Sequence, residues 1–280
     1  MKTAIKSTDN ASGKGSDNEN FPVGSILIRA DLRPHVHAFY NFAREADDIS
    51  DHPTMDGQKK ILKLEAFSRT LTDDRCEEVK SAVALRRSLR QTGVSPQHAL
   101  DLITAFKRDS LQLRYRDWED LMDYCNFSAN PVGRYMLDLH KVEKTSWPSN
   151  DVLCSALQIL NHIQDCAEDC RELDRVYLPQ DMMEKFDVTT DDLIRETSSQ
   201  GLRALIDAML DKLEPMIEEA RKLPKQIPAR RLRLETSAIC VLAEQMIKTL
   251  RSRDPLCENT KPSKTMKIFA VLKGVARAFL

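Results

Sequence analysis

The feature that most constrains this chain is the spacing of its apolar residues, which recur at helical intervals along almost the whole sequence. Strand-like alternation is rare, and only 8 Gly and 12 Pro occur in 280 residues, which suits long helices better than many tight turns. The pattern predicts helices over residues 34–51, 59–71, 76–90, 96–115, 118–140, 151–170, 190–223 and 229–251, and a last one from residue 266. Helices of this kind without strands pack as a bundle, which can enclose a central cavity.

Residues 1–20 are rich in Ser, Asn, Asp, Lys and Gly and show no apolar stretch after a basic start. This composition predicts a flexible N-terminal tail rather than a secretory signal. No repeat or shift of composition divides the rest, so residues 21–280 are expected to form a single domain. No apolar run reaches the roughly 18 residues that a membrane-spanning helix needs.

The charges and cysteines limit the partners and the compartment. Lys and Arg number 42 against 43 Asp and Glu, and this balance argues against a nucleic-acid partner. The 7 Cys are an odd number without CxxC spacing, which favours reduced thiols over a disulfide scaffold. We therefore expect a cytoplasmic protein, either fully soluble or peripheral at the inner face of the membrane.

A first acidic stripe, made of Asp47, Asp48 and Asp51, lies near the end of the first predicted helix. Asp47 and Asp51 are four positions apart, so they share one helix face at a separation of about 6 Å along the axis. Arg44 and Tyr40 come one and two turns earlier on the same face. Like charges at this spacing repel each other, so an inward-facing stripe needs a compensating cation.

A second acidic stripe is made of Asn161, Asp165 and Asp169, with Glu168 at its edge. Its helix is strongly apolar on either side of these groups, so part of the stripe is expected to be buried. Burying an unpaired carboxylate costs much free energy. Mg²⁺ prefers oxygen ligands and completes its shell with water and substrate phosphates. Two such stripes on facing helices can hold several Mg²⁺ ions around one diphosphate and neutralise it as a leaving group. The alternative is a solvated acidic surface.

Four motifs, in order along the chain, resemble those of the squalene/phytoene synthase family. They read FYNFAREADDISD at 39–51, YCNFSANPVG at 124–133, NHIQDCAED at 161–169 and RVYLP at 175–179. The resemblance implies an all-α isoprenoid-synthase bundle around one central cavity. It also implies a magnesium-dependent enzyme that releases diphosphate from a prenyl diphosphate substrate.

The same resemblance implies roles for individual residues. The metal ligands are expected to be the members of the two acidic stripes, which are Asp47, Asp48, Asp51, Asn161, Asp165, Glu168 and Asp169. Arg44 and Arg175 match positions that bind the diphosphate. Tyr40 lines the same region, and Tyr124 matches a tyrosine near the departing diphosphate that donates a proton or a hydrogen bond, so both are expected to be catalytic.

Two segments depart from the usual family pattern, NFPVGS at 20–25 and SANPVG at 128–133. They look like one bacterial branch, which acts in the hopanoid route. The implied reaction ionises presqualene diphosphate, rearranges the cation and adds water to give hydroxysqualene. No glycine-rich dinucleotide fingerprint is present, so no nicotinamide cofactor is expected. The alternatives are a head-to-head condensing enzyme that makes presqualene diphosphate or phytoene, and a non-catalytic relative that acts as a scaffold.

Asn130 puts an amide into a wall that small apolar residues build in the family. A buried amide needs hydrogen-bond partners, and an ordered water is one of them. Pro131 removes a backbone donor and frees the carbonyl of Phe127. We therefore expect Asn130 to be a catalytic residue that helps to select water as the final nucleophile. The alternative is that it only bonds to the disrupted backbone.

The C-terminal stretch contains no acidic residue after Glu258. Its basic residues alternate with apolar ones, and they are Lys261, Lys264, Lys267, Lys273 and Arg277. Such a segment is typical of a helix that lies on an anionic membrane surface and helps an apolar substrate to enter or leave. The alternative is a packed last helix with a basic outer face.

Overall fold

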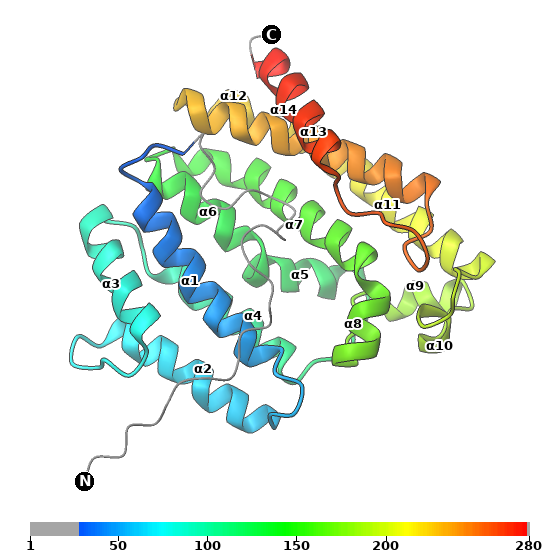
Figure 1. Ribbon diagram of the computed structural model, residues 1–280, viewed down its shortest axis with the longest axis horizontal. Coiled ribbons are helices and arrows are strands. Elements are labelled where there is room, and N and C mark those ends of the chain that lie inside the picture. Colours follow the sequence, from blue (N-terminus) through cyan, green and yellow to red (C-terminus); the bar gives the residue numbers. More distant parts are fainter. Residues whose placement is uncertain (1–27, 279–280) are drawn as a thin grey trace.

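The computed structural model describes residues 28–278, and this range folds into α-helices joined by loops (Figure 1). No strand occurs within it, and one isolated bridge pairs Arg114 with Val176. The all-α prediction is therefore confirmed. None of the helices in this range combines the length and apolarity needed to cross a membrane. The predicted tail at 1–20 and the NFPVGS segment lie outside the described residues, and a single domain over 21–280 stays a prediction.

The longer helices are α1 (Arg33–Ser50), α2 (Gly57–Thr72), α3 (Lys80–Thr92), α4 (Gln97–Asp109), α5 (Trp118–Ser128), α6 (Asn130–Leu139), α7 (Trp147–Gln164), α8 (Cys166–Leu173), α11 (Gln200–Ala220), α13 (Arg230–Ser252) and α14 (Lys264–Ala278). Shorter helices are η2 (Lys144–Ser146), α9 (Gln180–Lys185), α10 (Thr190–Leu193) and α12 (Leu223–Gln226). Polar side chains cap several of them. For example, the Asp117 carboxylate accepts a hydrogen bond from the backbone N–H of Asp120 at the start of α5.

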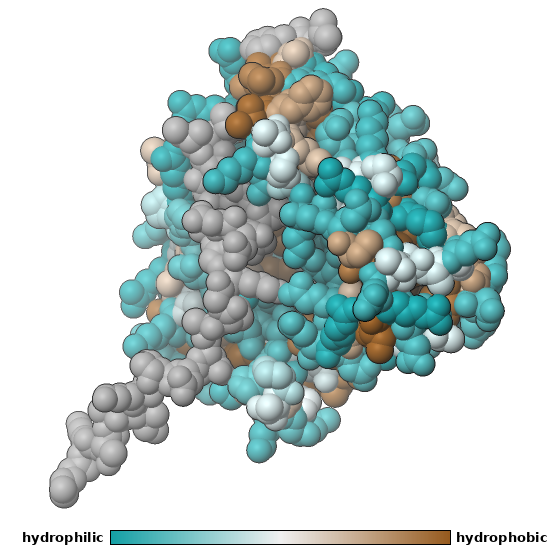
Figure 2. Space-filling view, turned by 45° about the vertical axis from the view of Figure 1, so that its right-hand side comes forward, coloured by the Kyte–Doolittle hydropathy of each residue, from teal (hydrophilic) through white to brown (hydrophobic). Residues whose placement is uncertain are grey.

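Two buried apolar clusters organise the bundle. The N-terminal cluster joins α1 to α4 and takes Tyr135 and Leu139 from α6. Its centre includes Phe39, whose ring stacks on that of Tyr135 with centroids 3.9 Å apart. The C-terminal cluster is larger and draws mainly on α5, α7, α11 and α13. The last helix, α14, packs along α13 at one end of the molecule, where apolar side chains come to an otherwise mainly hydrophilic surface (Figures 1 and 2).

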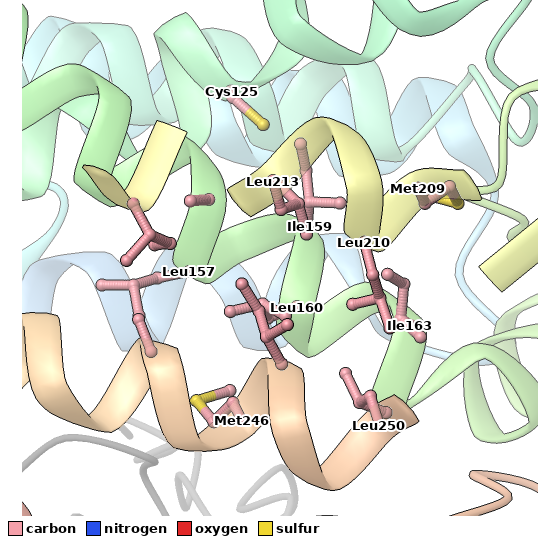
Figure 3. Packing of buried hydrophobic residues seen from close by; sticks show 14 of the residues in the cluster. Cys125, Leu157, Ile159, Leu160, Ile163, Met209, Leu210, Leu213, Met246 and Leu250 are labelled. Carbon is pink, nitrogen blue, oxygen red and sulfur yellow. The ribbon is translucent and has the colours of Figure 1, made fainter. Parts of the chain in front are cut away.

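Helix α7 forms the centre of the C-terminal cluster. Figure 3 shows its apolar side chains between those of α11 and α13. Ile159, Leu160 and Ile163 are fully buried, and they meet Leu213 from α11 and Met246 from α13. A helix that is apolar on nearly all sides is buried on nearly all sides. The second acidic stripe at the end of α7 therefore begins inside the molecule.

The first predicted helix is confirmed, since α1 has Pro34 in its first turn and ends before Pro53. The prediction of one continuous helix over 118–140 is wrong, because the helix breaks at Ala129. Pro131 lacks the N–H that would continue the ladder, and it lies in the first turn of α6 instead.

Three other predicted boundaries are wrong. The helix over 96–115 ends at Asp109, because residues 113 and 115 instead bond to the backbone of residues 176 and 180. The helix over 151–170 begins earlier, at Trp147, with Pro148 in its first turn, and it is interrupted at Asp165. The helix over 190–223 is divided into α10 and α11, since the Ser199 side chain caps a new start.

Candidate active site

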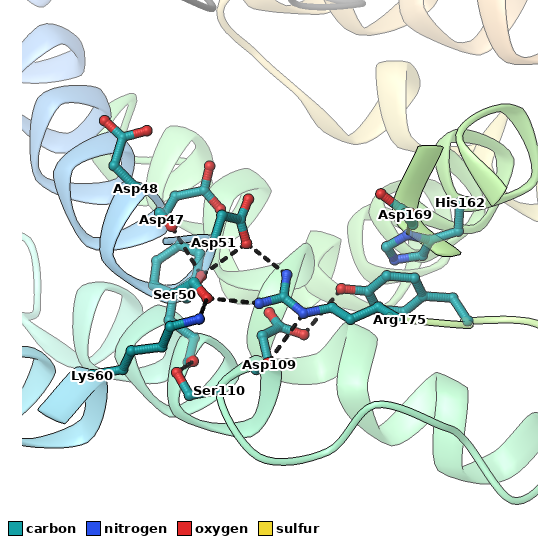
Figure 4. Close-up of polar contacts among 12 residues, drawn as sticks. Asp47, Asp48, Ser50, Asp51, Lys60, Asp109, Ser110, His162, Asp169 and Arg175 are labelled. Atoms are coloured by element: carbon teal, nitrogen blue, oxygen red, sulfur yellow. Dashed lines mark hydrogen bonds and ion pairs between the residues drawn. The ribbon is translucent and has the colours of Figure 1, made fainter. Parts of the chain in front are cut away.

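The first acidic stripe lies in the last turns of α1 (Figure 4). Arg44 reaches forward along the same helix and bonds to Asp47 at 2.8 Å and to Asp48 at 2.9 Å. These pairs follow from the i,i+3 and i,i+4 spacing that the sequence predicts. Tyr40 is half-buried one turn before Arg44. The structure therefore brings together the five residues that the sequence places on this face, with Asp51 as the C-terminal cap of α1.

Arg175 binds the end of this stripe from a distant part of the chain. Its guanidinium lies 2.5 Å from the Asp51 carboxylate, and it donates to the backbone oxygens of Ser50 at 2.8 Å and of Asp109 at 3.1 Å. Lys60 donates to the same Ser50 carbonyl at 2.7 Å. Two cations thus meet the C-terminal end of α1, where the helix dipole favours positive charge. We call the three contacts of Arg175 the arginine clasp.

A buried aromatic cluster surrounds Asp109 at the end of α4. Its carboxylate accepts a hydrogen bond from Tyr124 at 2.8 Å and another from Tyr177 at 3.0 Å. Burial raises the pKa of Asp109 above its usual range, and burial also raises the pKa values of both tyrosines, which stay phenols. Tyr115 stacks on Tyr177 with ring centroids 5.3 Å apart.

The second acidic stripe spans the junction of α7 and α8. The helix is interrupted at Asp165, but the hydrogen bonds from Asp165 N–H to the carbonyl of Asn161 and from Asp169 N–H to that of Asp165 persist, which keeps the helical register. Lys261 reaches this junction from the segment between α13 and α14, and its ammonium lies 2.8 Å from Asp165 and 3.8 Å from Glu168. The carbonyl of the preceding Thr260 accepts a hydrogen bond from Gln164 at 2.5 Å.

Figure 4 shows Asp47, Asp48 and Asp51 on the guanidinium side of Arg175, and His162 and Asp169 of the second stripe's helices on the other side of the view. Residues 174–179 supply both Arg175 and Tyr177. Arg175 extends toward Asp51, whereas the ring of Tyr177 stacks on His162 with centroids 3.5 Å apart. His162 in turn lies 3.9 Å from the Asp169 carboxylate. A continuous series of polar and aromatic contacts therefore connects one stripe to the other. Across residues 28–278, no three His, Cys, Asp or Glu side chains converge on one metal position.

Burial disfavours the charged form of one carboxyl group in each stripe. Burial and the neighbouring Asp51 raise the pKa of Asp47 to about 8. Burial also raises the pKa of Asp165, although Lys261 opposes the shift. A cation bound beside either group would favour its charged form and lower its pKa again.

Asn130 is buried at the start of α6, and 1% of its surface is exposed. Its amide N–H donates to the Asn126 side chain at 3.0 Å, and its amide oxygen accepts from the Ser155 hydroxyl at 2.9 Å. Both hydrogen bonds go to side chains, so they differ from the backbone bonds that the alternative interpretation expects.

Three site residues were missed by sequence reasoning or given too little weight. Asp109 belongs to none of the four motifs, and Tyr177 is part of RVYLP without a predicted role. The hydrogen bond between them joins segments 68 positions apart, so no local pattern indicates it. Lys261 carries no local signal, because its partner Asp165 lies almost 100 residues earlier in the chain.

A model of the squalene/phytoene synthase family matches residues 16–267. The hydroxysqualene synthase of Rhodopseudomonas palustris is 43% identical over 247 residues, which cover 88% of this chain and 84% of that relative. The hydroxysqualene synthase of Zymomonas mobilis is 40% identical over 281 residues, which cover 99% of this chain and 94% of that relative.

Among solved structures, a squalene synthase from Alicyclobacillus acidocaldarius aligns with a TM-score of 0.72 at 30% identity, covering 82% of this chain and 87% of the other. The family model covers most of the chain, and both curated relatives extend through the two acidic stripes and the arginine clasp. The four motifs, the all-α fold and these matches agree, and this chain belongs to the squalene/phytoene synthase family.

Proposed function

We propose that this chain is a hydroxysqualene synthase that converts presqualene diphosphate to hydroxysqualene and diphosphate. The C–O bond to the diphosphate breaks, and the diphosphate leaves with the electron pair. The cyclopropylcarbinyl cation rearranges, water adds to it through oxygen, and the adduct loses a proton. The observation that carries this proposal is the identity of 43% and 40% to two relatives of that name over 88% and 99% of the chain.

We infer that the metal is Mg²⁺ and that the two acidic stripes hold it. Both stripes offer oxygen donors, and each contains a carboxyl group whose charged form burial disfavours and a bound cation would stabilise. Mg²⁺ binds through one or two carboxylates and takes its other ligands from water and substrate phosphates, so a complete protein cage is not required. When bound, Mg²⁺ neutralises the departing diphosphate.

We expect the two arginines to act differently. Arg44 is half-buried, and its partners Asp47 and Asp48 are on its own helix, so it can turn from these carboxylates toward a diphosphate oxygen. Arg175 directs its guanidinium to three protein acceptors. Its first role is therefore to position Asp51 for metal binding. We propose that Arg175 also contacts the diphosphate, since a guanidinium has five N–H donors and these bonds use three of them.

The aromatic cluster contains two hydroxyl groups whose directions are fixed. Tyr124 and Tyr177 both donate to Asp109, and the Tyr177 ring stacks on the rings of Tyr115 and His162. We propose that Tyr124 also gives a hydrogen bond or proton to the leaving diphosphate, after its hydroxyl turns away from Asp109. Tyr40, on the face of the first stripe, is proposed to line the same region.

We propose that Asn130 helps to select water as the nucleophile, because it is a buried amide held in place by Asn126 and Ser155. The test is Asn130→Gly, with the products from presqualene diphosphate resolved by mass. Rearranged or eliminated hydrocarbons are expected in place of part of the hydroxysqualene. The matched control is Asn126→Ala, which removes a partner of the amide but leaves Asn130 intact. Hydroxysqualene as the only product of Asn130→Gly, at an unchanged rate, would refute this role.

The proposed reaction is tested by offering presqualene diphosphate and farnesyl diphosphate separately, with Mg²⁺ or with a chelator, and with or without a reduced nicotinamide. Hydroxysqualene is expected from presqualene diphosphate alone, only with Mg²⁺, and without the nicotinamide. Presqualene diphosphate formed from farnesyl diphosphate would instead identify the condensing enzyme. Squalene that accumulates only with the reduced nicotinamide would also contradict the proposal. Absence of any diphosphate release in all mixtures would favour a non-catalytic scaffold.

A further inference from the structure

Helix α14 exposes four large apolar side chains and turns two small residues toward its neighbour. Ala270 is 2% exposed and Gly274 is buried, and both face α13. Four large apolar side chains are exposed by 43–67%, and they are Ile268, Phe269, Val271 and Leu272. A surface helix normally shows the opposite arrangement, with its large apolar residues toward the core. We call these four side chains the α14 patch.

Close contacts fix α14 in this orientation. A Cβ atom on Gly274 would lie 2.5 Å from the backbone nitrogen of Ala238, so only glycine permits this approach of the two helices. The Ser237 hydroxyl donates to the Gly274 carbonyl at 2.8 Å, and Arg277 lies 2.5 Å from the Glu244 carboxylate. Rotation of α14 to bury the patch would break all three contacts. The exposure of the patch is therefore built into the packing.

Positive charge surrounds the α14 patch. At about 100° per residue, Ile268, Val271 and Leu272 share one arc of the helix, and Lys267 and Lys273 lie at its two edges. The Lys273 ammonium lies 5.7 Å from the ring centroid of Phe269, while Lys264 begins the helix. No acidic residue follows Glu258 in the sequence. This pattern matches a helix that rests in the interface of an anionic membrane, with its lysines at the level of the headgroups.

The segment that leads into α14 contacts the proposed active site. Lys261, three residues before α14, contacts Asp165 of the second acidic stripe. Docking through α14 would therefore hold the membrane beside a helix whose preceding segment reaches the site. A second copy of this chain fits the patch less well, because stable interfaces use about 20–30 residues a side and this patch has four large side chains.

We propose that the α14 patch docks this protein on an anionic lipid membrane, from which its apolar substrate enters and to which its product returns. The passage of these molecules rests on the proposed function, whereas the docking does not. Phe279 and Leu280, which follow in the sequence, lie outside the described residues.

The docking is tested by sedimenting the full chain with vesicles of phosphatidylcholine, either alone or with one third of phosphatidylglycerol. Binding to the anionic vesicles is expected to exceed binding to the neutral ones and to fall with added salt. The double variant Ile268→Glu/Leu272→Glu is expected to bind at least about tenfold more weakly. The matched control is Leu62→Glu on α2, where the replaced side chain is similarly exposed, at 62% against 67% for Leu272.

Equal sedimentation of the double variant and the wild type would overturn the proposal, as would absence of wild-type binding to anionic vesicles. Sedimentation velocity without lipid tests whether a second copy of this chain covers the patch instead. A wild-type dimer that becomes a monomer in the double variant would assign the patch to self-association. The double variant is expected to retain wild-type turnover of presqualene diphosphate in detergent micelles. Vesicle binding without any hydroxysqualene formation would refute the proposed function and leave the docking intact.

Discussion

The two acidic stripes are similar in composition but differ in how their charge is balanced. The first stripe is held by arginines, since Arg44 pairs along α1 and Arg175 binds the Asp51 end from a buried position. The second stripe meets a single lysine, Lys261, whose side chain is 50% exposed. Arginine gives several directed hydrogen bonds, whereas lysine is a mobile point charge. The first stripe is therefore fixed in advance, and the second is free to exchange its cation for another.

The largest expected effect comes from removing one carboxylate of each stripe. Asp51→Asn and Asp169→Asn are each expected to lower turnover by about 10³-fold, because each removes a proposed metal ligand that stabilises the leaving diphosphate. Only Asp51→Asn is also expected to lower the free energy of unfolding, since only Asp51 is bound by the arginine clasp. Steady-state kinetics at saturating Mg²⁺ and urea unfolding measure the two effects. Near-normal turnover in either variant would remove that stripe from the metal site.

The next effect concerns the clasp itself. Arg175→Met is expected to lower the free energy of unfolding by about 3 kcal/mol, because it leaves the Asp51 carboxylate and the Asp109 carbonyl without this donor and the Ser50 carbonyl with Lys60 alone. The control is Arg116→Met, which removes an ion pair from an arginine that is 78% exposed and is expected to leave the unfolding midpoint nearly unchanged. Equal unfolding midpoints in urea for the two variants would mean that the clasp is not structural.

A pH effect is expected at Asp47. Its pKa is raised from 3.8 to about 8, so the folded state binds the proton more tightly than the unfolded chain. The resulting stabilisation is fully present below the unfolded value and is lost as the pH rises toward 8. The melting temperature of the chelated wild type should therefore fall more steeply over this interval than that of Asp47→Asn. Added Mg²⁺ should reduce the difference, and parallel pH profiles without metal would contradict the shift.

The smallest effect is expected at Lys261. Lys261→Gln should change the free energy of unfolding by less than about 1 kcal/mol, because the lysine is half exposed. It should also lower the Mg²⁺ concentration for half-maximal thermal stabilisation by about threefold to fivefold, since Mg²⁺ no longer competes with the ammonium. The control is Lys264→Gln, which replaces another exposed lysine at the first residue of α14. An unchanged Mg²⁺ midpoint would make Lys261 a simple surface ion pair.

Local sequence patterns were sufficient to predict the first stripe but not to predict the residues around it. The positions of Pro34 and Pro53 and the i,i+4 spacing of the acidic residues predicted α1 and its stripe correctly, because both signals depend on residues a few positions apart. The interruption at Asp165 did not follow from periodicity, since the apolar pattern continues through it. The contacts of Lys261 and the burial of Asp109 depend on segments that only the folded chain brings together. Tertiary contacts of this kind leave no trace in local propensity.

The arginine clasp also has a consequence for the order in which the chain folds. It joins Arg175 to a partner 124 positions earlier, and Tyr177 reaches Asp109 across 68 positions. Closing loops of this size costs chain entropy before the new contacts can offset that cost, so long-range pairings form late. Helices α1 to α4 can collapse around their own apolar cluster beforehand. The carboxylates would then reach their final geometry only when the second half of the chain docks, so the transition state for folding should contain the bundle without its catalytic centre.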